Sequence, residues 1–199
     1  MVDGWTLTGN YISFYELAED KNVRHNGKNA IKVKSIKAST LGFGATYKST
    51  KDESYAGKRI RLSGFLKTEE VKDWAGLWIR VEEKMNYKYM GSADRQCMEV
   101  QNLQPKVEDT INEPLPPKQP ATLAFDNMYD CGGNNRSIKG TTDWKKYEVV
   151  VDVPANSGNI YYGALLSAGG TLWLDDLKIE VVDQSVPITG CKEESLASK

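Results

Sequence analysis

The chain has 199 residues, of which 40% are hydrophobic and 27% are charged, and its formal net charge is -1. This length is enough to bury a hydrophobic core, and no apolar run reaches the ~18 residues of a membrane-spanning helix. Nucleic acid and anionic membrane surfaces are held by an excess of basic residues, so the charge balance argues against both as partners.

The cysteines and the first residues bear on the compartment. Cys97, Cys131 and Cys191 are widely spaced and form no metal-binding pattern with the single histidine, His25. We expect free thiols in a reducing compartment. The opening sequence MVDGWTLTGNY lacks the basic flank and apolar stretch of a secretory signal. As it stands, the sequence predicts a cytoplasmic protein, or a secreted one if a leader has been removed.

Alternating apolar residues dominate the first half of the chain. An extended segment is expected at 11–17, and His25-Asn26-Gly27-Lys28 predicts a turn, because Asn-Gly favours positive φ. Strands are predicted at 30–36, 41–47, 59–67 and 75–82. The residues expected on the apolar faces of the last two strands are Ile60, Leu62 and Leu66, and then Leu77, Ile79 and Val81.

Residues 84–121 interrupt this alternation. Five of the seven prolines lie there, and proline removes a ladder donor, so the segment is predicted to be a long insertion between two strands. A strand follows at 122–128, with Leu123 and Phe125 inward and Ala124, Asp126 and Met128 outward. Three further strands are predicted within 140–182. We expect one domain over 1–183 and a loosely held polar tail over 184–199.

Three segments of the chain carry recognisable motifs, GKRIRLSGFLKT (57–68), TTDWKKY followed by VDVP (141–147 and 151–154), and GTLWLDDL (170–177). They resemble segments of galactose-binding-like jelly-roll domains, and in particular of carbohydrate-binding modules of the family 4/9 type. The resemblance implies a jelly roll with a binding role. Short alternating strands with almost no helix signal predict the same class, an all-β sandwich of two antiparallel sheets.

The resemblance also implies a structural calcium ion, with Asp176 as the first metal candidate and Asp175 as the second. A further acidic ligand would come from Glu16, Glu19 or Asp20, since calcium takes 6–8 oxygen ligands. The alternative is that Asp175 and Asp176 accept backbone donors or pair with a lysine.

Outward-facing residues on two strands indicate a binding surface. Trp78, Arg80 and Glu82 alternate on one strand, and Asp126 and Met128 lie on another. An aromatic plate with a few polar groups suits a carbohydrate or another small polar ligand. Further candidates are Tyr47 and Phe65 for the plate and Tyr87, Tyr89 and Tyr129 for a lid. In the alternative interpretation, Trp78 packs beneath the insertion and Arg80 pairs with Asp126.

The sequence contains no nucleophile elbow, zinc-protease motif or phosphate-binding loop, so a non-catalytic binding module is predicted. One enzymatic alternative stays open, a glycosidase with Glu82 and Asp126 as its carboxylate pair. The second functional hypothesis is a sensory or protein-interaction domain that contacts a protein partner through the proline-rich insertion.

Overall fold

The computed structural model describes residues 2, 4–27, 29–37, 42–85, 119–129 and 135–191. These residues contain β1 Thr6–Thr8, η1 Ile12–Phe14, β2 Tyr15–Asp20, β3 Ala30–Ser35, β4 Phe43–Thr50, η2 Glu53–Tyr55, β5 Arg59–Glu83, β6 Thr122–Asp126, β7 Ile138–Asp152, β8 Ser157–Ser167 and β9 Thr171–Val182. The two η elements are short 3-10 helices. Within the described ranges, no helix is long and apolar enough to cross a membrane.

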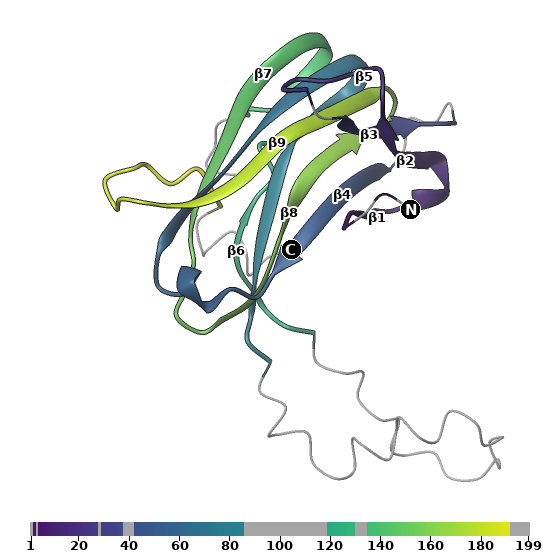
Figure 1. The fold of residues 1–199 in the computed structure, drawn as a ribbon. Helices are drawn as coiled ribbons and strands as arrows, with labels where there is room; N and C mark the ends of the chain where they lie inside the picture. The colour runs from purple at the N-terminus through teal and green to yellow at the C-terminus, as the bar shows by residue number, and fades with distance from the viewer. Residues whose placement is uncertain are drawn as a thin grey trace, which may run out of the picture.

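One long strand, β5, belongs to both layers of the fold (Figure 1). Its first half lies between β7 and β9, whereas its second half lies between β8 and β6. The first sheet therefore has the order β2-β3-β9-β5-β7 and the second has the order β1-β4-β8-β5-β6. All of these pairs are antiparallel.

The separate strands predicted at 59–67 and 75–82 are in fact one strand of 25 residues. Its register against β7 shifts three times between Leu66 and Ala75. Within this stretch Glu70 has a left-handed backbone, with φ of 50°. Such irregularities bend a strand sharply. The bend lets β5 leave the first sheet and enter the second without a loop.

The core lies between the inner faces of the two sheets. The predicted inward residues of β5 are all fully buried, namely Ile60, Leu62, Leu66, Leu77, Ile79 and Val81. They meet Val149 and Val151 of β7, Ile160 and Leu166 of β8, and Leu172 and Leu174 of β9. Each buried side chain of this size stabilises the fold by roughly 1.5–3 kcal/mol. The protein is therefore an all-β jelly-roll β-sandwich, as the sequence predicts.

The segment that follows β9 is held more firmly than expected, because residues 184–191 connect the edges of both sheets. Arg59 donates two hydrogen bonds to carbonyls of this segment. The N–H of Thr189 donates to the Val150 carbonyl on β7, and that of Cys191 to the Phe125 carbonyl on β6. Residues 192–199 lie outside the described part of the chain.

Cys191 corrects the expectation of free thiols, because it takes part in a disulfide whose partner lies outside the described residues.

Candidate binding groove

The outer face of the second sheet carries a groove of about 440 Å³. Its lining residues come from all five strands of that sheet and from Gly9, which directly follows β1, and they are Thr8, Gly9, Phe43, Ala45, Tyr47, Trp78, Arg80, Phe125, Tyr161 and Leu165. Half of them are aromatic. The volume lies within the ~300–1,000 Å³ typical of sites for small ligands, and such sites combine apolar walls with few polar groups.

Cross-strand register brings Tyr47 and Trp78 together over β8. Both have Gly163 as their Cα partner, one from β4 and the other from β5. Because Gly163 has no side chain, the Trp78 indole can cross β8, and its Nε1 donates to the Thr46 carbonyl oxygen on β4 at 3.2 Å. The Tyr47 ring meets the indole edge-on, with 6.1 Å between centroids. These contacts hold the indole in one orientation at the floor of the groove.

Arg80, Glu82 and Tyr161 form the polar end of the groove. Arg80 Nη2 lies 2.6 Å from Glu82 Oε1, and the guanidinium carbon lies 5.2 Å from the centroid of the Tyr161 ring. Burial raises the pKa of Tyr161, and the negative charge of Glu82 raises it further. The phenol therefore stays a neutral hydroxyl at physiological pH.

The structure brings Tyr47, Trp78 and Arg80 together, and Glu82 adjoins them through its ion pair. The alternative pairing of Arg80 with Asp126 is wrong, because Arg80 pairs with Glu82. The other lining residues were not predicted from the sequence, and they are Thr8, Gly9, Phe43, Ala45, Phe125, Tyr161 and Leu165. The alternation of Tyr161 and Leu165 along β8 was a usable signal, but the position of β8 between β4 and β5 was not evident from the sequence.

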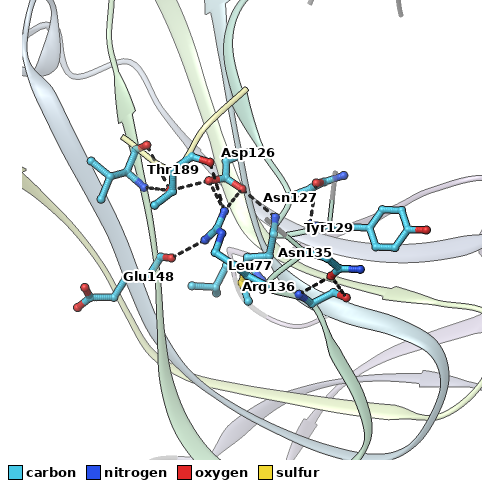
Figure 2. Close-up of polar contacts among 11 residues, drawn as sticks. Leu77, Asp126, Asn127, Tyr129, Asn135, Arg136, Glu148 and Thr189 are labelled. Atoms are coloured by element: carbon cyan, nitrogen blue, oxygen red, sulfur yellow. Dashed lines mark hydrogen bonds and ion pairs between the residues drawn. The ribbon is translucent and has the colours of Figure 1, made fainter. Parts of the chain in front are cut away.

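Asp126 was predicted to face outward, but its side chain faces inward. Figure 2 shows the polar contacts that hold it there. Its side chain is fully buried, and both carboxylate oxygens accept hydrogen bonds from Arg136 Nη2 at 2.6 Å. Thr189 Oγ1 donates to Oδ2 at 2.7 Å, and the Met128 N–H donates to Oδ1 at 2.8 Å. Burial raises the pKa of Asp126, and these partners oppose that rise. The carboxylate fastens the C-terminal segment to β6 and does not face a ligand.

From Ala124 onward, β6 has the opposite orientation to the prediction, whereas Leu123 is half-buried and packs against the core as predicted. Ala124 and Asp126 are buried, whereas Phe125 lines the groove. Partners across an antiparallel pair share a face, and Phe125 is opposite Arg80. Asp126 is opposite the buried Ile79, so Asp126 and the outward-facing Glu82 lie on opposite faces of the sheet. These two residues therefore do not form the carboxylate pair of a glycosidase.

Met128 does not reach the groove either. It is only 1% exposed, and its sulfur accepts a hydrogen bond from the Leu77 N–H at 3.1 Å. The Met128 side chain also packs where a Cβ on Gly76 would lie. Its role is to cover the sheet beside the groove.

Phe65 lies on the other sheet, in the half of β5 that pairs with β7 and β9. The His25 ring stacks on it with 3.7 Å between centroids. Residues 25–27 form a bend between β2 and β3, with Gly27 at a positive φ of 79° as the predicted turn requires, and Lys28 lies outside the described residues. This bend, called the His25 turn, packs against Phe65 on the first sheet. Phe65 therefore cannot extend the aromatic surface of the groove.

The two aspartates proposed as metal ligands hold the same turn. Asp175 Oδ2 accepts from the His25 N–H at 3.1 Å, and Asp176 Oδ2 contacts His25 Nδ1 at 3.0 Å and Asn26 Nδ2 at 2.9 Å. Nitrogen–hydrogen donors do not coordinate a cation, and no group of three potential ligands gathers in the described ranges. The arrangement does not fit a calcium site. Calcium binding stays a prediction that melting with and without EGTA would test.

The predicted lid is described only in part. Tyr129 stacks on Trp74 with 4.8 Å between centroids and is 40% exposed. Tyr87, Tyr89 and most of the insertion lie outside the described residues. The predicted packing of Trp78 beneath the insertion likewise falls outside the described residues.

No family model matches the chain. The chain is 35% identical over 187 residues to the uncharacterized HTH-type transcriptional regulator YbfP of Bacillus subtilis (strain 168). This alignment covers 94% of the chain and 50% of the regulator, so the chain spans about half the length of this relative.

Several solved structures share the fold at low identity. The xylan-binding domain CBM22-1 of Paenibacillus barcinonensis Xyn10C has a TM-score of 0.51 at 16% identity, over 92% of this chain and 89% of that domain. The family 16 carbohydrate-binding module-2 has a TM-score of 0.51 at 10% identity, over 89% and 91% of the two chains. The enzymatically active domain of tailspike protein 4 of bacteriophage CBA120 has 0.57 at 11% identity, over 90% and 20%. The likeness is to the jelly roll of carbohydrate-binding modules, and it does not single out the 4/9 type.

Proposed function

We propose that this protein is a non-catalytic carbohydrate-binding domain and that the groove on the second sheet holds the sugar. The observation that carries the proposal is the fixed Trp78 indole beside the polar end formed by Arg80, Glu82 and Tyr161. A sugar ring has an apolar face of C–H groups and a rim of hydroxyls. The first packs on an aromatic ring, and the second needs donors and acceptors nearby.

Two further observations support this proposal. The groove lies on the outer face of a jelly roll shared with domains whose names state xylan or carbohydrate binding. Moreover, Glu82 and Asp126, the carboxylates considered for glycoside hydrolysis, are on opposite faces and each is paired with an arginine. Both observations favour binding over catalysis.

The test compares Trp78→Ala with Trp144→Ala, a tryptophan on the other sheet that contacts His25. Isothermal titration with xylohexaose and affinity electrophoresis in soluble polysaccharides measure binding. Because buried tryptophans dominate many interfaces, Trp78→Ala should weaken binding about 30-fold or more, and Trp144→Ala should leave it unchanged. Equal binding by both variants would contradict the assignment of the groove.

A second candidate function is sugar sensing, as the ligand-binding part of a transcriptional regulator. The observation in its favour is the 35% identity to an HTH-type regulator over nearly the whole chain. The groove residue Phe125 accepts a backbone hydrogen bond from Cys191, and the neighbouring Asp126 bonds Thr189. A ligand in the groove therefore lies one strand away from the C-terminal segment.

Amide hydrogen exchange distinguishes the two functions. A sensor should change protection at Thr189, Gly190 and Cys191 when xylohexaose saturates the groove, because exchange reports local opening. A simple binding module should change protection only in the strands that line the groove. The protein-interaction role of the insertion stays a prediction, since most of that segment lies outside the described residues.

A further inference from the structure

The Arg80 guanidinium is restrained on three sides. Its Nη2 is paired with Glu82 Oε1, its plane lies over the Tyr161 ring, and its Nε is enclosed without a hydrogen-bond partner. The Arg80 side chain is nevertheless 42% exposed, whereas that of Glu82 is 9% exposed. The arginine therefore reaches the groove while its counter-ion stays behind it.

This arrangement sets the charge that a ligand meets. Arg80 is the one charged side chain among the lining residues in the described part of the chain. Because Glu82 follows two positions later on the same strand, its carboxylate cancels that charge within the fold. A ligand hydroxyl can accept a hydrogen bond from the remaining guanidinium N–H groups without disturbing the pair.

A ligand carboxylate would bind Arg80 less favourably than a hydroxyl does. To form a strong bidentate contact with Arg80, it would have to displace Glu82 from Nη2. Glu82 is nearly buried, so its displaced carboxylate would keep its contact with Tyr161 but lose its charged partner without gaining full hydration. The two carboxylates would also lie close together, and like charges repel strongly near a protein surface.

We propose that Glu82 is a specificity-determining residue that makes the groove accept neutral oligosaccharides and reject those carrying uronic acids. The inference rests on the proposed carbohydrate-binding function and refines its substrate class. It assigns to Glu82 the role of occupying Arg80, in place of direct contact with the sugar.

The chain offers a matched control in a second arginine–glutamate pair. Arg61 Nη2 lies 2.7 Å from Glu180 Oε1 on the outer face of the first sheet. Glu82→Gln and Glu180→Gln change the net charge equally, but only the first variant frees an arginine in the groove. A general effect of charge would therefore appear in both variants.

The experiment measures binding of xylohexaose and of a galacturonic acid hexamer to the wild type and both variants by isothermal titration. The wild type should bind the neutral hexamer and should bind the acidic one about tenfold more weakly or worse. Glu82→Gln should raise affinity for the acidic hexamer about tenfold, because a freed arginine makes a charge-assisted contact. Glu180→Gln should behave like the wild type.

The outcomes separate the two claims. If the neutral hexamer binds through Trp78 but both glutamine variants have the same neutral-to-acidic affinity ratio, the role of Glu82 is overturned and the groove stands. If no variant binds either hexamer, both claims are overturned. Should Glu82→Gln fail to fold, salt dependence of the wild type decides. The neutralised pair predicts no gain in affinity for the acidic hexamer at low salt, and a clear gain would overturn it.

Discussion

Both sheets are antiparallel and have five strands, but the outer face of the first carries ion pairs and that of the second carries an aromatic groove. On the first sheet, Arg61 of β5 lies between Glu148 of β7 and Glu180 of β9, at 3.5 and 2.7 Å. Lys146 and Lys178 pair with the same two glutamates at 2.7 and 2.6 Å. On the second sheet, the corresponding centre is the aromatic groove around Trp78.

The difference comes from the residues at the centre of each face. Long charged side chains cover the first sheet and match one another across strands, which leaves a flat, solvated surface. On the second sheet, Gly163 contributes no side chain between Tyr47 and Trp78, so the Trp78 indole crosses β8 at this position and aromatic rings line the groove. The glycine in register with two aromatic residues therefore lets this face form a groove, whereas charged side chains cover the other face.

The largest expected effect comes from releasing the C-terminal segment, which connects the edge strands of the two sheets. Asp126→Ala leaves Arg136 without its carboxylate and Thr189 Oγ1 without its acceptor. Removing one partner of a buried ion pair is costly, so urea unfolding should show a loss of about 3 kcal/mol or more in unfolding free energy. The matched variant Asp152→Ala breaks a half-exposed pair with Arg59 and should cost about 1 kcal/mol or less. Equal losses would show that Asp126 does not anchor the C-terminal segment.

A smaller effect is expected from adding a side chain at Gly163. A Cβ added at Gly163 would clash with the Thr46 carbonyl oxygen, the acceptor of the Trp78 indole. Gly163→Ala should therefore destabilise the fold by about 1–3 kcal/mol, and it should weaken xylohexaose binding by displacing the indole. The control is Gly169→Ala, whose Cβ would meet only the flexible Lys72 side chain. Normal binding by Gly163→Ala would mean that the indole does not depend on this glycine.

The sequence was sufficient to predict which side chains face the core in β5, where large apolar residues alternate with charged residues and Trp78. Leu77, Ile79 and Val81 settled the faces of β5, and with them the outward placement of Trp78 and Arg80. In β6 the large apolar residues Leu123 and Phe125 alternate with the small or polar residues Thr122, Ala124 and Asp126, so the large residues were predicted to face inward. The orientation depends instead on Arg136, a distant partner that holds Asp126 inside. A one-residue error in phase moves every side chain of a strand to the other face, which explains why Phe125 and Asp126 were misplaced together. Met128 lies beyond the end of β6 and has a left-handed backbone, with φ of 64°, so the alternation of the strand does not extend to it.

The smallest expected effect concerns the acid stability of the charged outer face of the first sheet, called the flat face, where Glu180 pairs with Arg61 and Lys178. Hydrogen bonds from Lys178 and Arg61 lower the pKa of Glu180 from 4.5 to about 2. Because the folded pKa lies below the unfolded value, this stabilisation is present above pH 4.5 and is lost as the pH falls toward 2. Glu180→Gln lacks the titrating group. Its deficit in unfolding free energy relative to the wild type should therefore shrink steadily over that pH range, as followed by urea unfolding. A deficit independent of pH would mean that the glutamate stabilises through packing alone, and the flat face would then owe little to its charges.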